Sequence, residues 1–260
     1  MFIFGCGGVK KENYRVNILG VVERMEYKEL HSWEVTPTEA VDIQKKLRDQ
    51  VKIQKLAGKV RYIAGADMSF ERFSNVVYAG FVVVDVKTLE VVASSTIVTE
   101  AKFPYISGLF SFREVPPLLE AWKKLDLEPD VVVLDGQGIA HPRRFGLASH
   151  IGLLIDKPTI GCAKTILVGK YHDLPPYAGS TVPLMDKGEQ VGMVLRTQNK
   201  VRPIYVSVGH LIDLVDALKV IKNTIGDYRI PAPTREAHLL VNKARVAAGS
   251  PIETEEDSEE

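Results

Sequence analysis

A short, wholly apolar run constrains the fold of this chain more than any other feature. Residues 131–134 read VVVL and offer no polar side chain to water, so they predict a strand that is buried on both faces. Strands of this kind belong to parallel sheets with helices on both sides. A helix-like segment at 111–125 precedes the run, and a helix at 146–155 and a strand at 158–164 follow it. This alternation predicts an α/β domain.

The segments before this run predict a different pairing. Three Val-rich runs at 60–70, 76–86 and 90–100 are separated by short polar turns, which is typical of an antiparallel meander. Three antiparallel strands followed by helix, strand, helix and strand is the order of the ribonuclease-H-like fold, a mixed central sheet with helices on both faces. The remaining elements are expected as follows: a helix from Thr36-Pro37 to about Ala57, a hairpin at 189–197 and 202–209, and helices at 210–225 and 233–248.

Composition narrows the class of protein further. The chain has 260 residues, 45% of them hydrophobic, which is enough for one well-packed domain. No apolar run reaches membrane-spanning length, and two cysteines cannot form a disulfide framework. We therefore expect a cytoplasmic protein with no membrane partner. We also expect it to be a monomer.

The two ends of the chain differ from the rest. Residues 1–24 are expected to be an extension outside the domain, with Met25 as a candidate alternative start, and the domain itself is expected over residues 25–250. Residues 251–260, PIETEEDSEE, hold six acids and no base and predict a solvated, disordered tail. Without the tail, 33 basic residues face 27 acidic ones, so the body carries about +6. That charge permits phosphate binding without proving it.

Acidic residues at the ends of the expected strands indicate the chemistry. In the expected order the first and fourth strands end side by side, and they carry Asp67 and Asp135. Glu114 opens the helix between them. Carboxylates gathered at one place raise each other's pKa values, and a hard divalent cation removes that penalty. Taken alone, an aspartate at a strand end is most often a turn or helix cap. Because the fold order predicts where both side chains point, Asp67 and Asp135 are candidate ligands for Mg²⁺, for which Mn²⁺ can substitute, and such an ion takes further ligands from substrate phosphate.

Other candidate residues have ordinary structural explanations when each is taken alone. Lys164 ends the next expected strand, where it can bind phosphate, but a strand-end lysine is also simply exposed. His238 lies at the edge of the apolar stripe of the last helix, where a packed histidine is the ordinary case. Tyr105 and Ile106 belong to an aromatic loop, FPYISGLFSFRE, that can push between stacked bases or pack against the sheet edge.

Five segments of the chain resemble endonuclease V, a family of inosine-directed nucleases. They read GADMSF, PYISGLFSFRE, DGQGIAHPRRFGLASHIG, GCAKTILVG and PAPTREAHLL, in the family's order. The resemblance implies a ribonuclease-H-like enzyme of DNA repair that needs Mg²⁺ or Mn²⁺. Such an enzyme nicks DNA at the second phosphodiester bond 3′ to deoxyinosine, the product of adenine deamination. It leaves 3′-hydroxyl and 5′-phosphate ends.

The resemblance also assigns roles to residues. Asp67 and Asp135 match the family's metal-binding aspartates, Glu114 matches its third acidic residue, and Lys164 and His238 match further active-site positions. Tyr105 falls in the loop that separates the strands. In that loop many members have a second proline where this chain has Ser107, which predicts a less rigid loop.

Recognition of the base is expected from the main chain. Hypoxanthine has an oxo group where adenine has an amino group, and it lacks guanine's exocyclic amine. Main-chain groups can read that edge of a flipped base where glycines let the backbone approach. The expected pocket walls are Gly108, Gly136, Gly161 and Leu167, and His141 and Arg143 would hold neighbouring phosphates.

Three alternatives accompany this interpretation. Some relatives that favour RNA also carry serine at position 107, which keeps an inosine-RNA endoribonuclease open. A non-catalytic module that binds inosine-bearing nucleic acid is the second, and the intact acidic set argues against it. A phosphotransferase of the sugar-kinase class would need a second similar domain and a phosphate-cradling glycine loop, for which the chain is too short.

Overall fold

The computed structural model describes residues 25–71 and 74–249; the expected N-terminal extension and acidic tail lie outside them. The strands are β1 (Tyr62–Phe70), β2 (Val76–Asp85), β3 (Val91–Glu100), β4 (Val131–Leu134), β5 (Thr159–Ala163), β6 (Thr181–Asp186), β7 (Glu189–Leu195) and β8 (Ile204–His210). The helices are α1 (Pro37–Leu47), the short 3₁₀ helix η1 (Arg48–Gln50), α2 (Phe110–Trp122), α3 (Leu147–Ile155), α4 (Leu214–Thr224) and α5 (Ala232–Ala247). Within the described residues, no helix combines the length and apolar character needed to cross a membrane.

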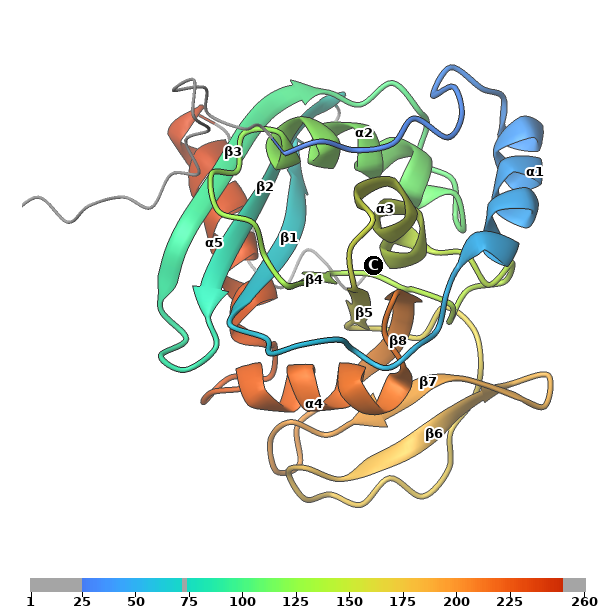
Figure 1. Ribbon diagram of the computed structural model, residues 1–260, viewed down its shortest axis with the longest axis vertical. Helices are drawn as coiled ribbons and strands as arrows, with labels where there is room; N and C mark the ends of the chain where they lie inside the picture. The colour runs from blue at the N-terminus through green and yellow to red at the C-terminus, as the bar shows by residue number, and fades with distance from the viewer. Residues whose placement is uncertain (1–24, 72–73, 250–260) are drawn as a thin grey trace, which may run out of the picture.

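The strands form one mixed sheet in the order β3-β2-β1-β4-β5-β8-β7-β6 (Figure 1). The first three strands pair antiparallel, as the meander predicted. β4 lies between β1 and β5 and runs parallel to both, so the predicted strand alternation with helices is confirmed. β8 and β7 continue the sheet in antiparallel fashion on the other side of β5.

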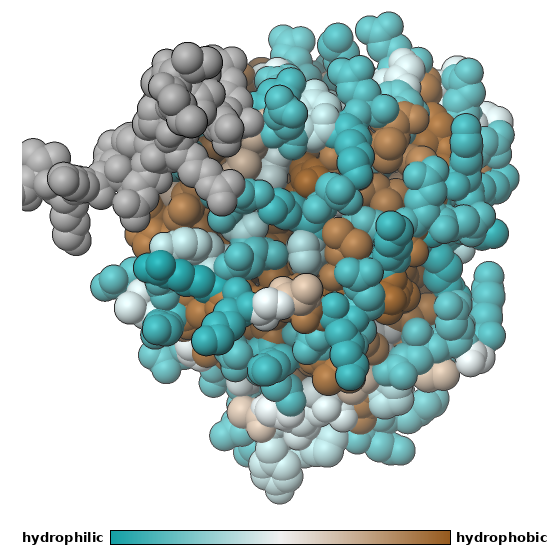
Figure 2. All heavy atoms as spheres, in the orientation of Figure 1, coloured by the Kyte–Doolittle hydropathy of each residue, from teal (hydrophilic) through white to brown (hydrophobic). Residues whose placement is uncertain are grey.

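Helices cover both faces of the sheet. Successive residues of a strand point to opposite sides, so alternate residues of β4 pack against different helices. On β4, Val132 and Leu134 belong to a core cluster with residues of α2 and α3. Val131 and Val133 belong to a second cluster with residues of α4 and α5. All four side chains are fully buried, and burial of each contributes about 1.5–3 kcal/mol. Hydrophilic side chains cover most of the outer face seen in Figure 2, and apolar groups appear between them.

Helix α1 is shorter than the sequence predicted. It begins as expected, with Thr36 accepting from Glu39 N and the Glu39 carboxylate accepting from Thr36 N at 2.7 Å. However, it ends at Leu47, and after η1 the chain is extended, so the predicted extension of this helix to Ala57 is wrong.

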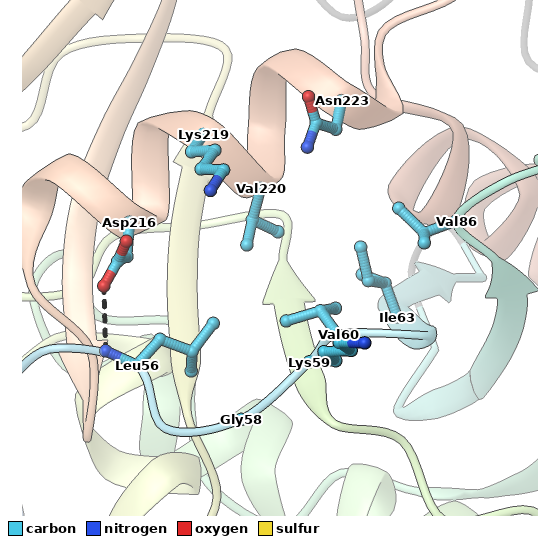
Figure 3. A pocket seen from close by; sticks show the side chains of 10 residues that line it. All are labelled: Leu56, Gly58, Lys59, Val60, Ile63, Val86, Asp216, Lys219, Val220 and Asn223. Atoms are coloured by element: carbon cyan, nitrogen blue, oxygen red, sulfur yellow. Dashed lines mark hydrogen bonds between the residues drawn. The ribbon is translucent and has the colours of Figure 1, made fainter.

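Tertiary contacts explain why the helix stops. The main-chain N–H of Lys52 donates to His210 Nδ1 at 3.2 Å, and that of Leu56 donates to Asp216 Oδ2 of α4 at 2.8 Å (Figure 3). A helix would need the same donors for its own carbonyl groups. The extended segment and α4 enclose a small cavity of about 410 Å³.

The sequence interpretation also missed the edge strand β6. Its sequence, TVPLMD, contains Pro183, which cannot donate to a neighbouring strand and argues against a central position. At the sheet edge this loss is tolerated, because only one side of the strand needs a partner. The predicted hairpin next to it is confirmed as β7 and β8.

Candidate active site

Asp67 and Asp135 come together because β1 and β4 run parallel and side by side. The register pairs Ala66 with Leu134, so the next residue on each strand is an aspartate. The main chains remain close at this point, where Asp135 N donates to Ala66 O at 3.4 Å. The side chains are mostly buried, 13% exposed for Asp67 and 20% for Asp135. The parallel pairing thus gives one edge of the sheet two neighbouring carboxylates.

A third carboxylate, that of Glu114, reaches the same edge from the beginning of α2. Burial raises the pKa of Glu114 to about 8, and the negative charges of Asp67 and Asp135 act in the same direction. Burial and the charge of Asp67 also raise the pKa of Asp135. These couplings mean that the three carboxylates lie within electrostatic reach of one another. We refer to Asp67, Glu114 and Asp135 as the acidic rim.

Two basic side chains contact the acidic rim. Lys164 follows β5, the parallel neighbour of β4, and its Nζ lies 2.7 Å from Asp135 Oδ2. Burial alone would lower the pKa of Lys164, but the charge and hydrogen bond of Asp135 outweigh it, and the pKa is raised. His238 of α5 donates from Nδ1 to Asp67 Oδ2 at 2.8 Å. Each aspartate therefore has one basic partner.

Close packing of α5 against β1 brings His238 to the acidic rim. A Cβ atom on Gly65 would lie 2.0 Å from Pro233 O, so this approach requires glycine. One turn after His238, Asn242 donates to His238 Nε2 at 2.8 Å and accepts from the Ser69 hydroxyl at 2.8 Å. With Nε2 accepting, neutral His238 carries its proton on Nδ1, facing the aspartate.

The chemistry of the acidic rim fits a hard divalent cation. Carboxylate oxygens are the ligands that Mg²⁺ and Mn²⁺ prefer. Burial first, and then the charge of Asp67, raise the pKa values of Glu114 and Asp135, so a bound cation would favour their ionised forms. Over residues 25–71 and 74–249, no group of three or more His, Cys, Asp or Glu side chains is arranged so that it could hold a metal ion.

A cavity of about 990 Å³ opens beside the acidic rim. Predicted site residues from both halves of the sequence line it: Gly108, Glu114, Asp135, Gly136, His141, Lys164, Leu167 and His238. Gly161 lies behind this wall, because a Cβ there would come within 2.4 Å of Gly138 N and 2.7 Å of Gly136 O. The glycine therefore allows β5 to pack against the turn that follows β4.

Tyr105 and Ile106 of the aromatic loop lie outside the cavity. Tyr105 is 74% exposed, and its ring contacts that of Phe110 with 4.5 Å between centroids. Ile106 is only partly buried and packs against a small cluster around Phe112. Neither Tyr105 nor Ile106 lines the cavity, so any contact they make with a ligand lies outside it.

His141 and Arg143 face the main chain of that loop. His141 is 3% exposed, and burial, followed by the charge of Arg143, lowers the pKa of His141 to about 4. It is therefore neutral at physiological pH. His141 Nε2 donates to Gly108 O at 3.0 Å, and Arg143 Nη2 donates to the same oxygen at 2.6 Å. Of the two, only Arg143 carries a charge that could attract phosphate.

Sequence reasoning missed two polar residues of the site. Asn242 could have been found, because it lies four residues after His238 and therefore on the same helix face. Gln44 of α1 is fully buried and lines the cavity. No local pattern distinguishes Gln44 from the other glutamines of its segment, because its partners lie in distant parts of the chain.

Known proteins are similar to this chain in both sequence and fold. The family model for endonuclease V matches residues 45–239. Endonuclease V of Myxococcus xanthus is 50% identical over 87% of this chain and 97% of its own length. The crystal structure of Streptomyces avermitilis endonuclease V is 42% identical, with a TM-score of 0.80 over 84% of this chain and 97% of that one.

A further solved structure holds nucleic acid. It is Ciona intestinalis endonuclease V in complex with a 24mer DNA containing an inosine followed by a ribo-adenosine. This protein is 29% identical, with a TM-score of 0.69 over 81% of this chain and 98% of that one. These matches, together with the two neighbouring aspartates and the cavity beside them, show that the chain belongs to the endonuclease V family and is therefore an endonuclease.

Proposed function

We propose that this enzyme nicks DNA at deoxyinosine in the course of DNA repair. The cut would fall at the second phosphodiester bond on the 3′ side of the lesion and leave 3′-hydroxyl and 5′-phosphate ends. The observation that carries the proposal is the acidic rim, three carboxylates at one strand edge with a lysine in contact, beside a cavity large enough for a nucleobase. The inosine in the DNA bound to the Ciona protein supports the choice of lesion.

Mg²⁺, or Mn²⁺ in its place, is the proposed cofactor, with Asp67 and Asp135 as the residues that would hold it. When bound, such an ion offsets the repulsion between the carboxylates, polarises a phosphate and lowers the pKa of water. Glu114 would supply a further acceptor for water at the same edge. His238 would keep the Asp67 carboxylate oriented through its hydrogen bond. Lys164 would place its ammonium group against a phosphate bound beside Asp135.

The cavity would receive the base after it has left the helical stack. Gly108, Gly136 and Leu167 line it, so main-chain groups are available to a hypoxanthine edge. Gly161 would contribute indirectly, by letting β5 pack behind this wall. Tyr105 and Ile106 would separate the strands from their exposed loop. A base held here while cleavage takes place at the acidic rim accounts for a cut that is offset from the lesion.

Inosine-containing RNA is a second candidate substrate. In the oligonucleotide bound to the Ciona protein, a ribo-adenosine follows the inosine. Contacts with the sugar 2′-hydroxyl would let a nuclease of this kind distinguish RNA from DNA.

A nicking assay tests the proposal directly. Four labelled strands of one sequence are needed: deoxyinosine in duplex, deoxyinosine in single strand, inosine in RNA, and an undamaged duplex. We expect one product from the deoxyinosine substrates with Mg²⁺ or Mn²⁺ and none with a chelator, mapped on a sequencing gel to the second bond. Extension of the product by a polymerase checks for the 3′-hydroxyl. Tight binding without cleavage in either ion would contradict the proposal.

A further inference from the structure

Residues 103–109, in the loop between β3 and α2, are held at both ends through their main chain. At their start, Arg113 Nη1 donates to Phe103 O at 2.8 Å. At their end, three side chains donate to one oxygen, Gly108 O. Between these points Tyr105 is exposed. The exposed tip of the loop therefore stands on two fixed supports.

Gln44 joins three segments of the chain at the second support. Its Nε2 donates to Gly108 O at 3.1 Å and to Phe145 O at 3.2 Å, and its Oε1 accepts from Arg143 Nε. The side chain is fully buried. Both amide hydrogens and the amide oxygen are thus paired inside the protein, and their partners lie on different loops. Removal of this amide would leave buried polar groups without partners, which is costly.

His141 and Arg143 complete this support, and we call Gln44, His141 and Arg143 the loop anchor. His141 Nδ1 accepts from Arg143 N at 3.2 Å while its Nε2 donates to Gly108 O at 3.0 Å. Gly108 itself has a φ of +75°, which favours glycine, and a Cβ there would lie 2.8 Å from Arg143 Nη2. The anchor and the glycine are therefore matched to each other.

We propose that the loop anchor positions the exposed loop for strand separation, and that Gln44 is a positioning residue for inosine recognition in duplex DNA. This inference rests on the proposed function, because strand separation matters only for a paired base. A loop that pushes between paired bases works better when its main chain is already ordered, since less conformational freedom is lost on binding. Ser107 restricts the main chain less than proline would, so the order comes from the anchor.

Replacement of Gln44 by methionine, which has a similar shape and no amide, tests the inference. Steady-state nicking is measured on duplex and single-stranded deoxyinosine DNA of one sequence. We expect KM for the duplex to rise about tenfold, the size of one net hydrogen bond, with kcat within about threefold of wild type. The loss on single strands should stay below about threefold. Gln50→Met, at an exposed glutamine close to Gln44 in the chain, is the matched control.

Equal losses on duplex and single strand, or an unchanged duplex KM, would overturn the inference. A second measurement separates it from the proposed function, because it needs no substrate. Hydrogen exchange in the free protein should be about tenfold faster over residues 104–109 in Gln44→Met and unchanged in Gln50→Met. If the wild type fails to nick deoxyinosine DNA, the proposed function is wrong. Independently of nicking, unchanged hydrogen exchange in Gln44→Met would show that the loop anchor does not order the loop.

A glycine pair provides a test from the loop side. Gly108→Ala introduces backbone strain and a contact with Arg143, whereas Gly58→Ala introduces similar strain at a φ of +79° with no atom within 4 Å. We expect Gly108→Ala to raise the duplex KM more than about tenfold, the cost of one lost hydrogen bond plus strain, and Gly58→Ala to leave it unchanged. Equal kinetics for the two variants would contradict a role for the contact with the anchor.

Discussion

The acidic rim and the loop anchor border the same cavity and differ in how their polar groups are paired. In the acidic rim, burial and like charge raise the pKa values of Glu114 and Asp135, so the ionised carboxylates are unfavourable there without a cation. In the loop anchor, the Gln44 amide is fully paired and Gly108 O receives three donors.

The difference separates chemistry from positioning. A cluster of carboxylates has affinity for a hard cation, because the cation removes the repulsion between them. A buried amide whose donors and acceptor are all paired restricts the main chain and has no capacity left for a ligand of its own. We therefore expect the rim to respond to ions and to loss of charge, and the anchor to respond to loss of hydrogen bonds.

The largest expected effect on nicking is that of Asp135→Ala. We expect nicking of deoxyinosine DNA to fall by at least about a thousandfold, because the proposed cation loses a direct ligand. Binding of the same DNA should stay within about threefold, since the loop and the cavity remain. A gel assay and a fluorescence-anisotropy titration measure the two quantities, with the exposed Asp126→Ala as control. Normal nicking by Asp135→Ala would remove the rim from the chemistry.

A divalent cation should stabilise the folded protein through the rim alone. At about one hundred times its Kd, Mg²⁺ should raise the free energy of unfolding by about 2.7 kcal/mol. In Asp67→Asn the increase should be smaller at the same concentration. Urea unfolding with MgCl₂, compared with KCl of equal ionic strength, measures this effect without reference to activity. An equal increase in both proteins would place the cation elsewhere.

The two regions should respond to pH with opposite signs when divalent cations are absent. The folded pKa of Glu114, about 8, lies above its ordinary value of 4.5, so it favours unfolding as pH rises from about 4.5 to 8. The folded pKa of His141, about 4, lies below its ordinary value of 6.5, so it favours unfolding as pH falls from about 6.5 to 4. Each slope is at most about 1.4 kcal/mol per pH unit.

Two variants separate these contributions. The free energy of unfolding of Glu114→Gln, minus that of wild type, should increase as pH rises from about 5 to 8. The same difference for His141→Asn should increase as pH falls from about 7 to 5. Urea unfolding across this range gives both differences. Parallel pH curves for either variant and wild type would mean that the replaced group does not titrate as the structure indicates.

The smallest expected effect belongs to Tyr105. Tyr105→Ala should lower nicking of inosine in duplex about fivefold and in single strands less than about twofold, since stacking on a base contributes on the order of 1 kcal/mol. Tyr177→Ala, another strongly exposed tyrosine, is the control. Initial rates on the two substrates measure the ratio. Equal losses on both would count against a role in strand separation.

Local patterns in the sequence already determined most of the architecture. The all-apolar VVVL run requires a strand covered on both faces, and the Val-rich runs with short turns require a meander. Because parallel strands end at the same edge, this order also predicts that Asp67 and Asp135 lie together. Where local pattern and tertiary contact competed, as after Leu47, the tertiary partners of the main chain prevailed.

The loop anchor was decided only by the tertiary structure. Gln44, His141 and Gly108 lie far apart in the chain, and none of them has a spacing that predicts its partners. Hydrogen bonds to a main-chain carbonyl depend on position rather than residue type, so they leave little trace in a sequence. Strand periodicity is local and can be read directly, whereas the pairing of buried polar groups depends on the completed fold.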